Sequence, residues 1–432
     1  MKNNKYFQYI VMGIFIFCIL VGAILFATYR SSSTADSQPI TIAIWGTLNS
    51  TNFNIFASKY FYDTKLKYTV DYTEKDPAVF DADLVEALAS GNGPDAIILS
   101  QDLILRYKNK AYLIPTTVLP ELQFKTDYIQ EAELYLSNEG IIALPFSVDP
   151  LVMYWNRDIF NNVGVVKPPT TWLEISNLVS KMTKKDSAQN ITRSTTALGE
   201  FRNVNNAKEI LSALFLQAGN SIVQVDPTNG SYRSVLMGSL ENSPSILALQ
   251  YYTNFSNPSK REYSWNRSLA NSLDVFANGD LAVYFGFASE FARIKEKNPN
   301  LNFDVTFLPQ VADAKINSTF GRMLAFSIMK NTASLINTYT VISALTSSAA
   351  YPYWASSFNI PSARRDILGQ TDKSAAKTIF NQSALISKGW LDPNSTETST
   401  IFKNMVESYT TGRESISSAV GTASDLINNL LK

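Results

Sequence analysis

The sequence predicts an α/β protein built as two lobes and preceded by one membrane-spanning helix, and three observations predict it. The chain has 432 residues, 45% of them hydrophobic, which is more than one hydrophobic core usually supports. Segments with strand and helix periodicity alternate from residue 40 onward. One uncharged apolar run near the N-terminus is long enough to cross a bilayer.

That apolar run extends from 10 to 27, and Tyr9 and Tyr29 lengthen it to 9–29. A membrane-spanning helix needs roughly 20 apolar residues, so we expect a transmembrane signal anchor here. Lys2 and Lys5 precede the run, and a positive-inside bias then places 1–8 in the cytoplasm and the body outside the cell membrane. The protein is therefore expected to be single-pass, with its body on the extracytoplasmic side.

A cleaved secretory signal peptide is the alternative for the same run, because the small residues Gly22, Ala23 and Ala27 could form a cleavage site. Lipidation is not expected, since Cys18 follows the bulky Phe17 rather than a small residue. In both interpretations the body is exported from the cytoplasm.

Residues 30–39 are rich in Ser, Thr, Asp and Gln and are expected to form a short tether. The next elements predicted are a strand at 40–45, a helix that buries Phe53, Phe56, Ala57 and Tyr60, a strand at 68–72, a helix at 78–89 and a strand at 96–99. Such alternation predicts a mainly parallel sheet covered by helices.

Farther along the chain, Thr171 and Glu174 form a capping-box pattern that predicts the start of a helix. The apolar side chains expected on one face of that helix are Trp172, Ile175, Val179 and Met182. A strand is expected around 196–198, followed by a helix that begins near Ala207 and ends near Gly219, and another strand at 281–285.

Composition excludes several classes of function. The chain has no histidine, so Ser-His-Asp catalysis and His-rich zinc sites are excluded, and its one cysteine lies in the apolar run. Lys+Arg and Asp+Glu both total 37, so no basic surface predicts a nucleic-acid partner. We expect no cofactor and no metal.

Segments spread over the body resemble, in order and spacing, the family 1 extracellular solute-binding proteins, the maltose-binding-like receptors of ABC importers. The segments that carry the resemblance are 40–46, 87–95, 144–149, 153–158, 168–174, 276–284, 306–309, 360–366 and 390–393. The resemblance implies a periplasmic-binding-protein-like fold of type II, with a ligand cleft between the lobes. It implies a first lobe of 40–147 plus 310–365, a second lobe of 148–309 plus 366–432, and a hinge that includes Phe146, Pro150 and Pro309.

Three predicted ligand-binding residues lie at strand ends of the first lobe or in the hinge-like segment 146–150. Trp45 ends the first strand, where open α/β sheets receive ligands, although a core tryptophan is the alternative. Asp102 and Asp149 match acidic binding positions of the family. Asp102 could instead cap a helix, and Asp149 could be a turn aspartate before Pro150.

The other predicted ligand-binding residues belong to the second lobe: Asn205, with neighbouring Asn203 and Asn206, and then Phe287, Ser289 and Glu290 after a strand. Helix capping is the alternative for the asparagines. Trp354 and Trp390 are expected to pack inside the lobes. An anionic ligand would need a cluster of arginines, and the candidates for such a cluster are Arg322, Arg364 and Arg365.

The resemblance implies the solute-binding component of an ABC importer, which captures a small polar ligand, a mono- or oligosaccharide, by closure of the lobes and delivers it to permease subunits. Within this role a polyamine, a phosphorylated polyol or a peptide stays open as the ligand, and two alternative roles stay open. One is a membrane-anchored sensing or docking protein. The other is a glycoside hydrolase that would pair Asp102 with Asp149 or Glu290.

Overall fold

The computed structural model describes residues 39–226, 228, 230–238, 243–370 and 372–432. Within these residues no helix is long and apolar enough to cross a membrane. The predicted cytoplasmic segment 1–8, the anchor at 9–29 and almost all of the tether lie outside the described residues.

The chain alternates strands and helices through most of its length. The strands are β1 (Ile40–Gly46), β2 (Tyr68–Glu74), β3 (Ala96–Ser100), β4 (Leu136–Ser137), β5 (Gly140–Ile141), β6 (Leu144–Asn156), β7 (Lys184–Lys185), β8 (Ile191–Thr196), β9 (Val223–Val225), β10 (Tyr232–Ser234), β11 (Leu281–Phe287), β12 (Phe303–Thr306), β13 (Thr319–Ile328) and β14 (Ser387–Lys388).

The α-helices are α2 (Ser50–Thr64), α3 (Phe80–Ala89), α4 (Ile104–Tyr107), α5 (Glu121–Asp127), α6 (Arg157–Asn162), α7 (Trp172–Met182), α8 (Ala207–Gln217), α9 (Pro244–Asn254), α10 (Ser272–Ala277), α11 (Glu290–Lys297), α12 (Leu335–Leu345), α13 (Tyr351–Phe358), α14 (Arg365–Leu368), α15 (Ala375–Leu385), α16 (Ser395–Thr410) and α17 (Ile416–Leu430). Two short 3₁₀ helices are η1 (Gln101–Leu103) and η2 (Gln130–Tyr135).

Local sequence signals produced several of these elements as predicted. Helix α2 buries Phe53, Phe56, Ala57 and Tyr60 on the face that their spacing indicated. Helix α7 begins with the complete capping box of Thr171 and Glu174. The strand expected around 196–198 is wrong in position, because β8 ends at Thr196 and the chain turns there toward Gly199, whose φ is +92°.

The main sheet is mixed rather than mainly parallel, and this corrects the prediction from the sequence. Its order is β2-β1-β3-β13-β6-β11-β8-β7. The pairs β1–β2, β1–β3 and β11–β8 are parallel, whereas β13 runs antiparallel to β3 and β6, and β6 runs antiparallel to β11. Two long strands that cross between the lobes in opposite directions impose the antiparallel pairs.

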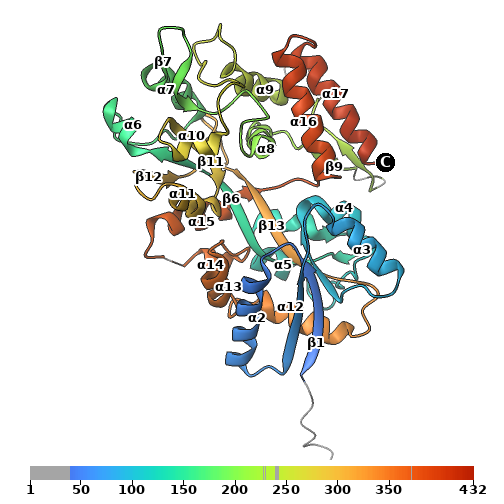
Figure 1. Cartoon of the computed structure of the whole chain (residues 1–432). Helices are drawn as coiled ribbons and strands as arrows, with labels where there is room; N and C mark the ends of the chain where they lie inside the picture. The colour runs from blue at the N-terminus through green and yellow to red at the C-terminus, as the bar shows by residue number, and fades with distance from the viewer. Residues whose placement is uncertain (1–38, 227, 229, 239–242, 371) are drawn as a thin grey trace, which may run out of the picture.

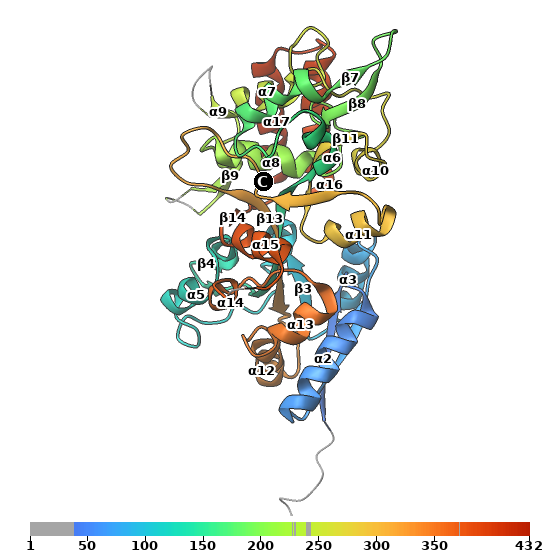
Figure 2. The same ribbon diagram turned by 90° about the vertical axis from the view of Figure 1, so that its left-hand side faces the viewer.

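The described residues form two hydrophobic core clusters, one in each lobe (Figure 1). The first contains residues from Ile42 to Val148 and from Met323 to Ala384, and the second runs from Leu151 to Phe320 and resumes from Phe380 into the C-terminal helices. Figure 2 shows α2, α12 and α13 on the first lobe and α16 and α17 on the second. Trp354 and Trp390 are 2% and 3% exposed, which confirms that they pack inside the lobes.

The core clusters suggest where the chain crosses. Strand β6 leaves the first core at Val148 and enters the second at Leu151, with Phe146 packed in the first core and Pro150 between the two. Pro309 lies inside the second lobe, where its carbonyl accepts a hydrogen bond from Gln217 Nε2 at 3.1 Å.

The segment after Pro309 also stays with the second lobe, since Gln310 forms a bridge to Thr171 beside α7. We therefore propose that the return crossing lies between Phe320 and Met323 on β13, not at Pro309, and that the lobe boundary expected at 309/310 moves with it.

Candidate functional site

A cavity of about 450 Å³ lies between the lobes at the carboxyl ends of β1 and β3, and we call it the front cleft. From the first lobe it is lined by Thr47 after β1, by Ser100 at the end of β3, by Asp102 after β3, and by the Asp81–Arg106 ion pair. From the second lobe it is lined by the segment Pro393 to Glu397. Clefts at the carboxyl ends of strands in open α/β sheets are the usual ligand positions.

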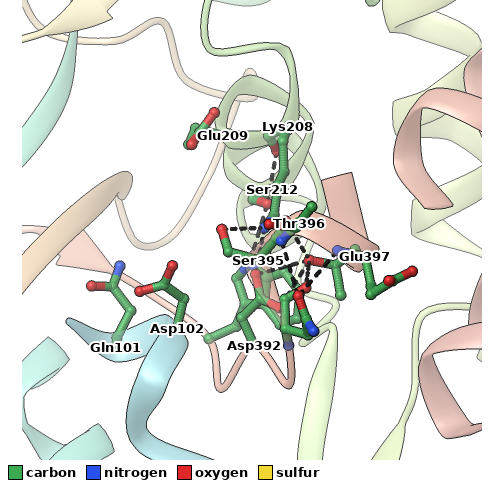
Figure 3. Close-up of polar contacts among 12 residues, drawn as sticks. Gln101, Asp102, Lys208, Glu209, Ser212, Asp392, Ser395, Thr396 and Glu397 are labelled. Carbon is green, nitrogen blue, oxygen red and sulfur yellow. Dashed lines mark hydrogen bonds and ion pairs between the residues drawn. The ribbon is translucent and has the colours of Figure 1, made fainter. Parts of the chain in front are cut away.

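Asp102 is the predicted site residue that lines the front cleft. It lies in η1, is half-buried, and accepts a hydrogen bond from the Ser100 hydroxyl. Neither residue caps a helix, because Ser100 before η1 makes no side-chain cap hydrogen bond and the residue before α4 is Leu103 rather than Asp102. Figure 3 shows Asp102 beside Gln101, across from Lys208, Glu209 and the 392–397 segment of the second lobe.

Gln101 has a structural task that the sequence did not reveal. Its Nε2 donates to the carbonyl of Gly321 at 2.7 Å, and its Oε1 accepts from the backbone N–H of Met323 at 2.8 Å. These bonds replace strand pairing where β3 has ended and β13 continues toward the second lobe. Gln101 thus fixes the turn that carries Asp102 against a crossing strand.

The second-lobe wall of the front cleft is the beginning of α16. Asn394 caps this helix by accepting hydrogen bonds from the N–H groups of Thr396 and Glu397 at 3.1 and 3.2 Å. Lys208 of α8 pairs with buried Asp392 at 2.5 Å and also donates to the carbonyl of Ser395 at 3.1 Å. The pair holds the start of α16 against α8.

A second polar cluster lies where β6 and β13 cross. Asp149 and Arg322 are paired residues of the two strands, and Arg322 shares a face of β13 with Leu324, which lines the front cleft. Asp149 Oδ1 accepts the backbone N–H of Ser289 at 3.0 Å. Burial raises the pKa of Asp149 to about 6, although this hydrogen bond and Arg322 favour its charged form.

Arg322 contacts Glu209 and Phe287 of the second lobe. Its Nη2 lies 2.8 Å from Glu209 Oε1, and its guanidinium lies 3.9 Å from the ring centroid of buried Phe287. A guanidinium held by a carboxylate and stacked on a ring offers little further charge to a ligand. Phe287 therefore supports Arg322 from below and presents no ring to the cleft.

Glu290 is occupied by its own lobe. Its Oε1 accepts from Asn206 Nδ2 at 2.8 Å and from the N–H of Phe287 at 3.0 Å, and its Oε2 accepts from the Tyr284 hydroxyl at 2.5 Å. These three donors anchor the turn between β11 and α11. Ser289 in this turn is exposed.

Two predicted residues lie apart from both clusters. Trp45 is half-buried on β1, packs against the first core, and has Lys75 Nζ 4.0 Å from its ring centroid; it does not line the front cleft. Asn205 accepts from the Ser272 hydroxyl at 3.1 Å and from the N–H of Leu273 at 3.0 Å, so it fixes the start of α10.

Sequence reasoning missed Lys208, Glu209 and the 393–397 segment. The pattern Asp392-Pro393-Asn394 followed by Thr396 and Glu397 is a helix-start signal that could have placed the beginning of α16. Nothing local indicated that Lys208 would reach it. Among the described residues, no group of three or more potential ligands could hold a metal ion.

A family model described as bacterial extracellular solute-binding protein matches residues 57–381, and the chain belongs to this family. No curated protein sequence matches the chain. The sequence resemblance is thereby confirmed at the level of the family.

Solved structures of the same fold include three solute receptors. An ABC transporter solute-binding protein from Thermotoga lettingae, bound with alpha-D-tagatose, matches with a TM-score of 0.65 at 18% identity over 91% of this chain and 100% of its own. A cyclo/maltodextrin-binding protein complexed with maltotetraose matches with a TM-score of 0.71 at 13% identity, covering 92% and 98%. The GacH receptor of Streptomyces glaucescens matches with a TM-score of 0.67 at 14% identity, covering 90% and 98%.

Proposed function

We propose that this protein is the membrane-anchored, extracytoplasmic receptor of an ABC importer, and that it captures a sugar in the front cleft by closure of its lobes. The observation that carries the proposal is the position of the cleft. It lies between the lobes, at the ends of β1 and β3, and is lined from both sides by polar groups. A ligand there would contact both lobes at once and so stabilise the arrangement that encloses it.

The charges around the cleft argue against an anionic ligand, because Asp81, Asp102 and Glu397 line it with Arg106. Arg106 is paired with Asp81, and Arg322 is paired with Glu209, so an anion would have to compete with a carboxylate for either guanidinium. Asp102 and the hydroxyls of Ser395 and Thr396 can instead accept or donate hydrogen bonds to sugar hydroxyls. Among the residues that line the cleft the aromatic one is Phe80, which is 3% exposed, so the proposal favours a short sugar over a long stacked chain.

The same contacts argue for binding rather than hydrolysis. A glycosidase needs an acid and a base or nucleophile that both reach the scissile bond. Glu290 already accepts three hydrogen bonds within its lobe, and Asp149 is held by Ser289. We therefore propose no catalytic role for either carboxyl group.

A thermal-shift screen of the full-length chain in detergent tests the proposal. Maltotetraose, tagatose and acarbose are compared with amino acids, polyamines and sugar phosphates. A sugar at 100 times its Kd is expected to stabilise the protein by about 2.7 kcal/mol and raise the Tm by a few degrees. Stabilisation by a polyamine or phosphate alone would contradict the sugar assignment, and no stabilisation by any compound would favour a sensing or docking role.

A further inference from the structure

A second interlobe cavity, of about 490 Å³, lies on the opposite face of β13, and we call it the rear cavity. The first lobe lines it with Leu134, Leu136 and Ile142, and the second lobe lines it with Leu216, Val223 and Tyr232. Alternate residues of a strand point to opposite faces. Leu324 lines the front cleft. A Cβ added to Gly321, on the other face of the strand, would point toward Glu131, which lines the rear cavity.

Glu131 is the buried acid of the rear cavity. It lies in η2 of the first lobe, is 3% exposed, and neither carboxyl oxygen has a hydrogen-bond partner among the described residues. A Cβ added to Gly321 would overlap its Oε2, and one added to Gly389 would come within 2.7 Å of its Oε1. The carboxyl group is thus covered by two glycines on the segments that cross between the lobes, β13 and the turn after β14.

The charged and titratable groups around Glu131 leave it unneutralised. Glu133 pairs with Lys125 at 3.6 Å, and the Tyr135 hydroxyl donates to the carbonyls of Leu99 and Met323. Across the cavity, Lys108 donates to the Tyr232 hydroxyl at 3.2 Å, and Lys388 lines the wall beside Gly389. Burial raises the pKa of Glu131 to about 8, so the carboxyl group is protonated at neutral pH in this arrangement.

Rotation of the lobes about β6 and β13 changes the two cavities in opposite senses, because they lie on opposite faces of the crossing strands. Narrowing of the front cleft separates the rear walls, which come from different lobes, and admits water to the carboxyl group. We propose that Glu131 is a proton-binding site linked to the front cleft, protonated while β13 and the turn after β14 cover its carboxyl group and ionised when closure of the cleft uncovers it. Its linkage to sugar rests on the proposed function.

The sign of the linkage follows from solvation. In the present arrangement the pKa of Glu131 is raised, and water in the opened rear cavity would lower it toward its ordinary value. Ionisation therefore favours the front-closed arrangement. As the pH rises toward 8, the front-closed population and the affinity for sugar should both increase, and each sugar bound at pH 7 should release a proton.

The first experiment uses protons alone, so that its failure is distinct from failure of the sugar assignment. Spin labels at Lys59→Cys on α2 and Lys181→Cys on α7, both exposed, report the interlobe distance in the full-length chain carrying Cys18→Ser. Between pH 6 and 9 the distance distribution should shift in the Glu131 protein and stay constant with Glu131→Gln. The matched control Glu133→Gln should shift as the parent does. An unchanged parent, or a shift that persists in Glu131→Gln, would overturn the proposal.

The second experiment measures the linkage to ligand by calorimetric titration with tagatose, and in parallel with maltotetraose, at pH 7 in two buffers of different ionisation heat. The parent should release up to one proton per sugar and gain up to tenfold in affinity per pH unit below pH 8, and Glu131→Gln should do neither. Binding without proton release would overturn the linkage. If neither sugar binds, the distance measurement alone decides the role of Glu131.

Discussion

Asp102→Ala should weaken sugar binding about ten- to hundredfold while leaving the fold intact. Asp102 lines the front cleft and accepts one internal hydrogen bond, from Ser100, so its carboxylate retains acceptor positions for sugar hydroxyls. Removing a charged acceptor that meets a ligand leaves the ligand hydroxyls unpaired in the closed cleft, at a cost of about 1 to 3 kcal/mol. Calorimetric titration with the sugar found by the screen measures the loss.

The control for this prediction is Asp71→Ala, an exposed aspartate on the outer strand β2 of the same lobe. It should bind sugar as the parent does, and both variants should melt close to the parent without ligand. Equal affinity of Asp102→Ala and the parent would mean that Asp102 does not bind the sugar. The cluster of Asp149 and Arg322 would then be the next candidate for the binding site.

Lys208→Ala should lower the free energy of unfolding by about 3 to 5 kcal/mol, because it leaves a buried carboxylate without its cation. The side chains of Lys208 and Asp392 are 10% and 5% exposed. Burial already raises the pKa of Asp392 although Lys208 opposes this, so loss of Lys208 would raise it further. Denaturant-induced unfolding of the full-length protein measures the change in the free energy of unfolding.

Lys297→Ala is the matched control, since Lys297 pairs with Asp274 at 2.8 Å with both side chains more than a third exposed. Exposed pairs contribute at most about 1 kcal/mol, so this variant should remain near the parent. Similar losses in the two variants would mean that the Lys208–Asp392 pair does not stabilise the start of α16 as argued. A stable Lys208→Ala protein would mean the same.

The parts of the fold that were predictable are those that local signals encode. The capping box of Thr171 and Glu174 and the buried face of α2 are each contained within one short segment. The antiparallel pairing of β13 with β6 joins residues about 170 positions apart, such as Arg322 and Asp149, and no local pattern specifies it. For the same reason the sequence led us to expect the return crossing at Pro309, whereas we now propose that it lies on β13.

The candidate site shows the same division. Asp102 follows a strand end, a position that topology makes accessible, and it lines the cleft. Trp45 is also at a strand end. Its neighbours Ile44 and Gly46 are buried on one face of β1, so Trp45 lies on the other face, where its ring packs beside Lys75. Glu290 carries the right chemistry, but its three internal donors come from residues as distant as Asn206. Which acceptors remain free for a ligand depends on such contacts.

A sugar is proposed to close the two lobes over the front cleft, and the interlobe distance between labels at Lys59→Cys and Lys181→Cys measures that closure. The measurement is made at fixed pH with and without saturating sugar from the screen. With sugar, the interlobe distances of the parent should shift to one narrower distribution, and those of Asp102→Ala should change much less at the same concentration. An identical distribution with every sugar, at concentrations that saturate binding or reach the solubility limit, would contradict it.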